Sequence, residues 1–365
     1  MKNLKYILVV LFCLLFTAQA QAYSYKTCGD KKIKWDSNSK TLYANTTSFP
    51  AGYWENGIRD TVNAFNRNPS KFRYGIAMDS GGVGRGNGQS EIWGWPGSKI
   101  DGAPAVASQR WTCYWLFGYH AWMNEVDVIY NYDEPFRWTA STSKNDLIRY
   151  KGTKRSLQTT GAHELGHGLI LNHVNTEYNV MGADFEHIHV NGSTARAYIG
   201  EDASDGAVYL YGDRGGWQDV GVVHWKYSGP SGEYSDHTKT VIYNSSGAVL
   251  PSVNVNGEIG HRVTRGQWVQ VEFTFENNGS NTQSGVNVGF FISTNDTIST
   301  GDRRVAGRTL SLGRDNVLTT STWVLIPSDL TPNTNYWIGA VVDETGSIAE
   351  AVEWNNATYI PIYVQ

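Results

Sequence analysis

The sequence predicts an α+β domain followed by an all-β domain, and three observations support this. The chain has 365 residues, which is enough for two domains that each bury a core. Before residue 213, apolar residues recur at helical spacing in three stretches. Beyond residue 250, apolar and polar residues alternate as they do in strands. The formal charge of -4 gives no basic field for nucleic acid, so a nucleic-acid-binding class is not expected.

Residues 1–22 have the pattern of a secretory signal peptide. Lys2 and Lys5 precede an apolar run from Tyr6 to Phe16, and Ala-Gln-Ala at 18–20 offers a small-residue cleavage site. This run is too short to span a bilayer, and no later stretch reaches about 18 consecutive apolar residues. We therefore expect a secreted, extracellular protein without a membrane span.

Residues 23–213 are expected to combine helices with strands in one domain. Apolar residues at helical spacing indicate the helices, and a Trp-, Tyr-, Val- and Gly-rich region between the first two indicates strands. We expect short strands at 33–35 and 41–43, the clearest strand at 126–130, and helices at about 52–66, 156–171 and 202–210.

The composition and the apolar pattern of the sequence change after residue 213. Residues 214–250 are polar and contain Gly- and Ser-rich passages, so we interpret them as a linker with connecting strands. In residues 251–365, Val269, Val271, Phe273 and Phe275 alternate with polar residues, and later segments repeat the pattern. Strands at this spacing, with Asn-, Gly- and Ser-containing turns between them, predict a β-sandwich.

Residues 163–167, His-Glu-Leu-Gly-His, carry the clearest chemical pattern. On an α-helix, residues four apart are turned by about 40° and offset by about 6 Å, so two imidazoles can bind one ion from the same face. Zinc accepts neutral nitrogen ligands in a tetrahedral shell. The adjacent Glu164 then lies beside the metal, where its carboxylate can hydrogen-bond a water molecule. The segment predicts a zinc site with a general base.

His173 can be a third ligand only if this helix ends early. In a continuing helix, His173 would lie about 9 Å beyond His167 and on another face. We therefore expect the chain to leave the helix soon after Leu169 and to turn back.

The segment from His163 to His173, followed by Asn179-Val180-Met181-Gly182, resembles the metzincin zinc peptidases, in their matrixin-like branch. Three histidines at this spacing and a methionine turn soon after the third form the pattern of that family. The strand at 126–130 and the segment 201–212 are similar to the strand before and the helix after the family's active-site segment. The resemblance covers about residues 30–213 and implies a twisted mixed sheet with an active-site helix.

This resemblance implies a secreted zinc endopeptidase that hydrolyses peptide bonds of extracellular proteins. His163, His167 and His173 would hold one zinc ion, and Glu164 would act as the general base. Met181 would form an apolar floor beneath the ion, with no further protein ligand. The resemblance also allows a calcium ion, although no Asp-rich loop in the sequence requires one.

A protein or peptide substrate is expected to bind as an added strand. An antiparallel strand would join an edge strand above the helix, within residues 104–116.

One position departs from the family pattern. Metzincins usually have glycine where this chain has Ile170, at the point where the backbone turns out of the helix. A β-branched residue at positive φ costs on the order of 1–2 kcal/mol. Gly168 or Asn172 could carry the turn instead.

The identity of the third ligand also has alternatives. Glu201, with Asp205, imitates the Glu-x-x-x-Asp spacing of another class of zinc peptidases. Asp184, His187 and His189 are further candidates.

Two cysteines, Cys28 and Cys113, remain once residues 1–22 are removed. In an oxidising compartment they pair most simply with each other. Two free thiols are one alternative. In another, Cys28-Gly29-Asp30 resembles the cysteine switch of matrixin propeptides, in which a thiolate binds the zinc.

The C-terminal residues 251–365 show a second, less specific resemblance. Phe275–Gly279, Ser293–Asp296 and Glu350–Asn356 resemble the immunoglobulin-like module of bacterial exported proteins linked to cell adhesion. This resemblance implies a sandwich that binds a cell-surface or matrix ligand, or one that serves as a spacer. A non-catalytic adhesin with a degenerate peptidase domain is therefore the alternative function.

Overall fold

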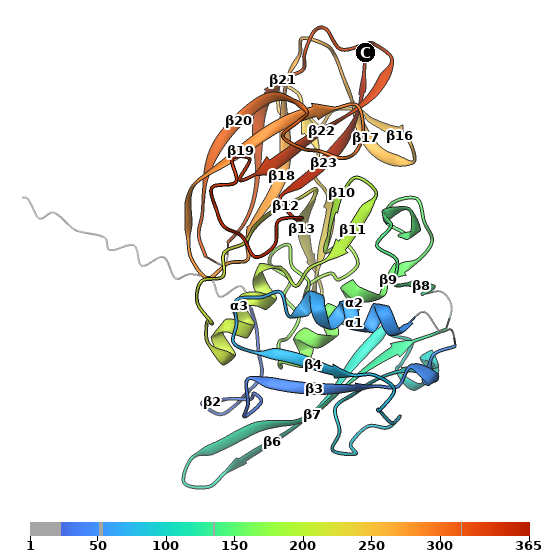
Figure 1. Cartoon of the computed structure of the whole chain (residues 1–365), viewed down its shortest axis with the longest axis vertical. Coiled ribbons are helices and arrows are strands. Elements are labelled where there is room, and N and C mark those ends of the chain that lie inside the picture. The colour runs from blue at the N-terminus through green and yellow to red at the C-terminus, as the bar shows by residue number, and fades with distance from the viewer. Residues whose placement is uncertain (1–22, 51–53, 134–135, 315) are drawn as a thin grey trace, which may run out of the picture.

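The computed structural model describes residues 23–50, 54–133, 136–314 and 316–365. The predicted signal peptide, residues 1–22, lies outside the described residues. The helices and the first sheet lie at one end of the long axis, and the strands of the C-terminal half lie at the other (Figure 1). In the part of the chain that the structure describes, no helix is long and apolar enough to cross a membrane.

The N-terminal half is built on a five-stranded mixed sheet with the order β4-β3-β5-β7-β6. Neighbouring strands are parallel except β6, which runs antiparallel to β7. β6 is the last strand in this order and is therefore an edge strand. An edge strand can accept a further strand through backbone hydrogen bonds. The strands are β3 Ser39–Ala44, β4 Arg73–Ala77, β5 Glu91–Trp95, β6 Ala105–Trp115 and β7 Tyr119–Asn131.

Three α-helices lie where the apolar spacing predicts them: α1 Trp54–Phe65, α2 Leu157–His167 and α3 Gly200–Tyr211. The helix α2 ends four residues before the predicted end at 171, which allows the chain to turn back. Its N-cap residue is Ser156, whose hydroxyl oxygen accepts a hydrogen bond from the Thr159 N–H at 3.3 Å. Helices α1 and α2 approach closely because Gly161 faces Thr61, whose methyl carbon would lie 2.4 Å from an added Cβ.

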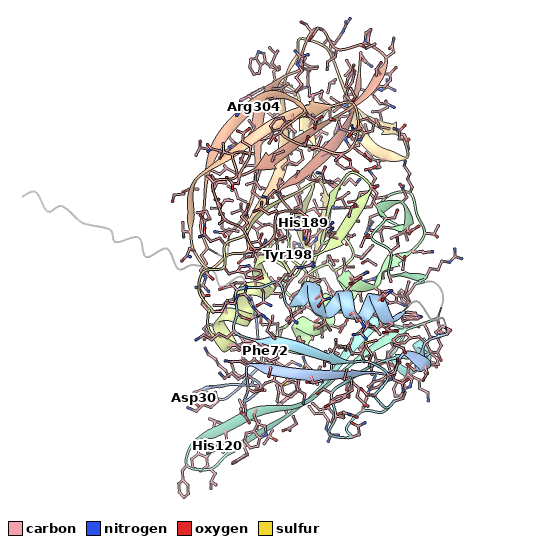
Figure 2. The ribbon with its side chains drawn as sticks, in the orientation of Figure 1. Asp30, Phe72, His120, His189, Tyr198 and Arg304 are labelled. Carbon is pink, nitrogen blue, oxygen red and sulfur yellow. A yellow bond between two sulfur atoms is a disulfide. The ribbon has the colours of Figure 1, made fainter. Side chains whose placement is uncertain are left out.

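One apolar core joins this sheet to the helices. Leu42 of β3, Ile58 of α1, Val128 of β7 and Leu165 of α2 belong to it and are almost completely buried. Phe72, labelled in Figure 2, packs in the same core. Because α2 is anchored on the sheet in this way, the positions of its polar side chains are fixed relative to β6.

Short elements connect these parts. They are β1 Thr27–Cys28, β2 Lys31–Lys32, β8 Trp138–Thr139, β9 Arg155–Ser156, β10 Ile188–Asn191, β11 Thr194–Ala197, and the 3-10 helices η1 Thr46–Ser48, η2 Gly97–Lys99 and η3 Lys144–Asp146.

The C-terminal half is a β-sandwich, as the alternating pattern predicts. One sheet contains β12 Val220–Val223, β15 Ile242–Tyr243, β18 Trp268–Asn277 and β21 Asn316–Leu325. The other has six strands: β16 Ser252–Val255, β17 Glu258–Val263, β19 Gln283–Ser293, β20 Arg303–Leu312, β22 Thr334–Val342 and β23 Ala357–Val364. Val271 and Phe273 of β18 pack with Val288 and Phe290 of β19 in one core between the sheets.

The region 214–250, predicted as a linker with connecting strands, contributes to two different structures. Its strands β12 and β15 both pair with β18 and so extend the sandwich. Between them, β13 Trp225–Ser231 and β14 Tyr234–Lys239 pair only with each other in the sheet topology and form a separate hairpin. This hairpin reaches the N-terminal half beside α2.

Candidate metal centre

Three histidines from two different segments meet at the end of α2. The Nε2 atom of His167 lies 3.1 Å from that of His163 and 3.0 Å from that of His173. In the described part of the chain, these three residues form the one group of His, Cys, Asp or Glu side chains that could hold a metal ion. The structure thus brings together the three histidines that the sequence singled out.

The other ring nitrogen of each histidine has an acceptor. The Nδ1–H groups of His163 and His167 donate to the Val180 and Leu171 carbonyls, each at 2.7 Å, and Nδ1 of His173 lies 3.3 Å from the Glu233 carboxylate. These contacts place the ring proton on Nδ1 and leave a lone pair on each Nε2.

This arrangement fits a small cation. The lone pair of His167 Nε2 meets those of the other two histidines at about 3 Å and cannot hydrogen-bond them, so a positive charge between the three nitrogens is the arrangement that satisfies all three. A tetrahedral zinc ion with Zn–N distances of about 2.0–2.1 Å requires nitrogens about 3.3 Å apart, close to the separations seen here. Burial and the neighbouring imidazoles hold the pKa of His167 well below its ordinary value, and burial also lowers the pKa of His163. Both rings are therefore neutral, as metal ligands must be.

The turn that delivers His173 is made by Ile170 itself. Ile170 has a φ of 71°, whereas Gly168 has a φ of -62°, so the expectation that Gly168 or Asn172 carries the turn is wrong. The Ile170 N–H donates to the His167 carbonyl at 2.7 Å, and the Leu171 N–H donates to the Gly166 carbonyl at 3.2 Å. This pair of bonds is the Schellman motif, which ends helices through a residue in the left-handed region.

Glu164 is buried between α2 and the edge strand β6. Burial, with a contribution from the charge of Asp184, raises the pKa of the Glu164 carboxyl to about 8, although the Ala107 N–H and Arg155 oppose this. The Ala107 backbone N–H that hydrogen-bonds this carboxylate belongs to β6. A cation at the histidines would lower the pKa again. The carboxylate is therefore placed to take up and release a proton beside the histidines.

Met181 lies directly under the helix and is fully buried. It lies within a turn in which the N–H groups of Gly182 and Ala183 donate to the Asn179 carbonyl. Its sulfur would lie 2.4 Å from a Cβ added at Gly166. This contact explains why glycine stands between Leu165 and His167. Met181 as an apolar floor beneath an ion stays a prediction.

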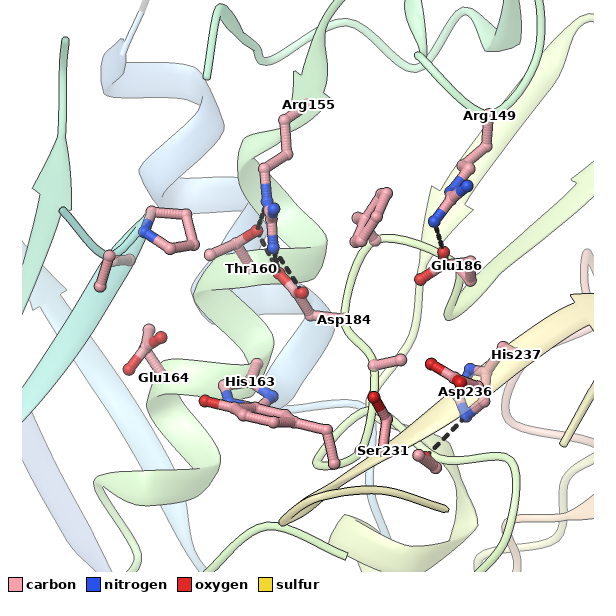
Figure 3. Close-up of a pocket in the computed structure, with 18 of the residues that line it drawn as sticks. Arg149, Arg155, Thr160, His163, Glu164, Asp184, Glu186, Ser231, Asp236 and His237 are labelled. Atoms are coloured by element: carbon pink, nitrogen blue, oxygen red, sulfur yellow. Dashed lines mark hydrogen bonds and ion pairs between the residues drawn. The ribbon is translucent and has the colours of Figure 1, made fainter. Parts of the chain in front are cut away.

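A cavity of about 510 Å³ opens beside Glu164 and His163. Its wall contains two ion pairs, Arg155 with Asp184 at 2.5 Å and Arg149 with Glu186 (Figure 3). The Thr160 hydroxyl donates to Asp184 as well. The remaining lining comes from the start of β6 and the residues before it, from the segment around Asp184, and from the β13–β14 hairpin: Ala103, Pro104, Ala105, Gly182, Ala183, Phe185, Ser228, Ser231, Tyr234, Ser235, Asp236, His237 and Thr238.

The β13–β14 hairpin supplies site residues that the sequence did not indicate. The ring of Tyr234 lies 4.1 Å from the ring of His173, measured between centroids. Glu233, the preceding residue, contacts Nδ1 of the same histidine. No spacing pattern links this hairpin to the helix, because it reaches the site only through the packing of the two halves. In the sequence, the residues of this hairpin have the polar composition of a connecting loop.

Among the described residues, the alternative ligands do not belong to the histidine group. Asp184 is engaged by Arg155, and Asp205 pairs with Arg314 at 2.8 Å. Nε2 of His189 lies 3.2 Å from Glu276 of the sandwich, and Nε2 of His187 lies 3.6 Å from it. Glu201 is buried in the first turn of α3 and is not part of the histidine group.

Cys28 and Cys113 form a disulfide, which confirms the pairing expected from the cysteine count. It joins the β1 segment to β6, 85 residues further along the chain. With its sulfur in this bond, Cys28 does not provide a thiolate to the histidines, and both alternatives for the two cysteines are wrong.

Comparison with known proteins identifies the C-terminal part of the chain. Residues 251–359 match the CARDB family and form a CARDB domain, in agreement with the expected adhesion-related module. Among solved structures, this chain is similar to the CARDB domain of a Pyrococcus furiosus protein, crystallised with di-metal ions. That match has 16% identity and a TM-score of 0.25, and it covers 41% of this chain and 90% of that chain. The solution structure of the same domain matches with 18% identity and a TM-score of 0.25, over 40% and 95% of the two chains. No curated protein matches the chain.

Proposed function

We propose that this chain is a secreted zinc-dependent endopeptidase of the metzincin type, acting on extracellular proteins or peptides. The observation that carries the proposal is the convergence of the Nε2 atoms of His163, His167 and His173 beside the buried Glu164. The antiparallel edge strand β6, the early end of α2 and the buried Met181 agree with what the family resemblance implies.

The histidines and Glu164 have separate tasks in the proposed reaction. His163, His167 and His173 would hold the zinc ion through Nε2. When bound, zinc supplies a Lewis acid that polarises the scissile carbonyl and lowers the pKa of a water molecule. Glu164 accepts the proton of the attacking water on a carboxylate oxygen and then donates it to the leaving amine nitrogen. The Ala107 N–H orients this carboxylate before substrate binds.

The substrate strand is proposed to lie along β6. This strand, Ala105–Trp115, falls within the predicted range 104–116 and passes directly over Glu164. A peptide paired with β6 has its scissile bond at the histidines, and the next side chain enters the cavity of about 510 Å³. The Arg149–Glu186 and Arg155–Asp184 pairs would then give this side chain a polar surrounding.

Metal content and casein hydrolysis, measured on wild type and Glu164→Ala, test the proposal. We expect one zinc per chain in both proteins and a loss of about 10²–10⁴-fold in kcat for Glu164→Ala, the usual contribution of a general base. Glu55→Ala, which changes an exposed glutamate of α1, is the matched control and should leave the rate unchanged. Wild type that takes up no metal and cleaves nothing would contradict the proposal.

A second candidate is the non-catalytic adhesin, and the CARDB domain favours it. In this case the sandwich binds a cell-surface or matrix ligand, and the peptidase-like domain serves as a scaffold. An inactive wild type that still binds matrix-coated surfaces would support this candidate. The possible calcium ion of the family resemblance stays a prediction, which metal analysis of the same samples can check.

A further inference from the structure

The β6–β7 hairpin ends in an exposed apolar tip. Trp115, Leu116 and Phe117 lie at its turn, and the Phe117 side chain is 95% exposed. Trp111, Tyr114 and Tyr119 on the two strands below are also exposed. The hairpin extends away from the rest of the molecule, as the ribbon in Figure 1 and the position of His120 in Figure 2 show. Exposed apolar groups gathered in this way mark an interaction surface.

The chain holds this tip in a defined shape. Phe117 has a φ of 53°, and the Leu116 N–H donates to the Gly118 carbonyl at 2.8 Å, so the turn is closed by its own backbone. The disulfide from Cys113 to Cys28 attaches the hairpin to the β1–β2 segment four residues before Phe117. Because the aromatic rings are exposed on an ordered ribbon, their apolar surface is available to a partner.

Lysines are concentrated in the segment that the disulfide joins to the hairpin. Residues 26–34, bound to the hairpin through the disulfide, contain four lysines and one acid, Asp30. Lys26 and Lys31 are exposed, and Lys26 also lies over the ring of Trp111 at 5.0 Å. Figure 2 places Asp30 and His120 at the same end of the molecule. The full chain has a net charge of -4, so this corner is positive against an acidic background.

We propose that the β6–β7 tip inserts into the interface of a lipid bilayer that contains anionic lipids. Trp, Tyr and Phe concentrate at the level of the lipid headgroups, where their rings lie between water and hydrocarbon. Lysines beside them are attracted to anionic headgroups. The tip is convex and ends in one almost fully exposed phenyl ring, which suits insertion into a soft surface better than a fit to a protein pocket.

This docking surface is continuous with the proposed active site. Ala107 contacts Glu164 and lies eight residues before Trp115 on the same strand, which corresponds to about 26 Å. A bilayer bound at the tip would therefore hold the edge strand β6 close to the membrane. The inference goes beyond the proposed peptidase activity and does not depend on it.

Flotation with lipid vesicles tests the inference. Wild type should float with vesicles of equal parts phosphatidylcholine and phosphatidylglycerol, and Trp115→Ala or Phe117→Ser should lower the partition coefficient about tenfold. Trp268→Ala, which removes a similarly exposed tryptophan of the sandwich, is the matched control and should have no effect. Lys26→Glu with Lys31→Glu should reduce binding to the anionic vesicles at low salt and have little effect at high salt.

Three results would overturn the inference. The first is a failed flotation test, in which wild type does not bind these vesicles or Trp115→Ala and Trp268→Ala lose binding equally. The second is a dimer that Phe117→Ser dissociates, which would make a second copy the partner. The third is slower cleavage of a protein substrate by Phe117→Ser without any vesicle binding, which would make the tip a protein-docking surface. Glu164→Ala should bind vesicles like wild type, so this test is independent of the peptidase proposal.

Discussion

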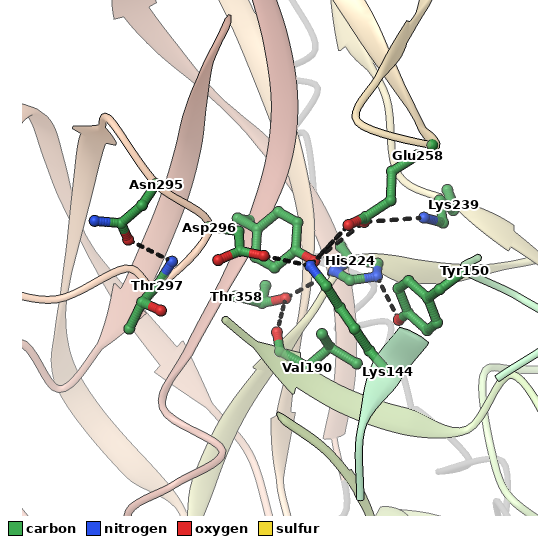
Figure 4. A network of polar contacts seen from close by, with 12 residues as sticks. Lys144, Tyr150, Val190, His224, Lys239, Glu258, Asn295, Asp296, Thr297 and Thr358 are labelled. Carbon is green, nitrogen blue, oxygen red and sulfur yellow. Dashed lines mark hydrogen bonds and ion pairs between the residues drawn. The ribbon is translucent and has the colours of Figure 1, made fainter. Parts of the chain in front are cut away.

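Replacing Lys144 should weaken the attachment of the sandwich to the N-terminal half. Lys144 lies in η3, and its Nζ is 2.7 Å from Glu258 and 2.6 Å from Asp296, two residues of the sandwich (Figure 4). It also donates to the Tyr359 hydroxyl. The side chains of Lys144 and Glu258 are only 3% and 4% exposed, so Lys144→Met leaves a carboxylate buried without its main partner.

The expected loss is about 3 kcal/mol. Breaking a buried pair costs about 3–5 kcal/mol. The lower end applies because Lys239 remains 3.8 Å from Glu258, and because Asp296 is 32% exposed and can be hydrated. In Lys144→Met combined with Glu258→Gln, neither charge is left buried alone. The double variant should therefore be less destabilised than the sum of the single variants, by about 1–3 kcal/mol.

Urea unfolding followed by tryptophan fluorescence measures these differences. Arg303→Met is the matched control, because Arg303 contacts Asp329 at a similar distance, 2.8 Å, with side chains 48% and 69% exposed. An exposed pair of this kind contributes little to stability, because water screens its charges. If Lys144→Met and Arg303→Met shift the unfolding free energy equally, the reasoning from burial is refuted.

Three further predictions concern the site and the interface. His173→Ala should lose zinc in metal analysis while Glu201→Ala keeps it; the reverse result would move the third ligand to α3. Gly166→Ala should lower the melting temperature and the zinc affinity, because its Cβ would overlap the Met181 sulfur, and an unchanged protein would contradict the close contact. His187 and His189 outweigh the effect of burial and lower the pKa of Glu276 from 4.5 to about 2. Its contribution to stability is therefore present above about pH 4.5 and is lost as the pH falls toward 2, so the unfolding free energy of Glu276→Gln, measured across this range, should fall less steeply than that of wild type.

Local patterns predicted the elements that depend on nearby residues. The three helices and the alternating strands β18 and β19 follow from spacing along the chain, because each element buries one face of its own residues. The histidine group was predictable for the same reason. One helical turn places His163 and His167 on the same face, and His173 can come close to them only if the chain leaves the helix soon after His167.

The remaining part of the site depends on contacts between distant segments. The hairpin that carries Glu233 and Tyr234 lies in a polar stretch that is interpretable only as a connection. It reaches His173 because β12 and β15, on either side of it, are fixed in the sandwich, and because the sandwich is held on the N-terminal half by buried ion pairs such as that of Lys144. Such contacts leave no periodic pattern in a single sequence.

The isoleucine at the turn shows how a local rule can be broken without loss of the site. A β-branched residue with positive φ costs on the order of 1–2 kcal/mol. The Ile170 side chain is fully buried in the N-terminal core, and burying an isoleucine contributes about 1.5–3 kcal/mol, which offsets this cost. The turn is also fixed from outside, because the Lys26 N–H donates to the Ile170 carbonyl at 3.2 Å and the Asn172 N–H donates to the Ser24 carbonyl at 2.8 Å. Glycine would be the easier residue for the backbone alone, but it would remove a buried side chain from the core, so isoleucine at this position is compatible with the turn that brings His173 to the other two histidines.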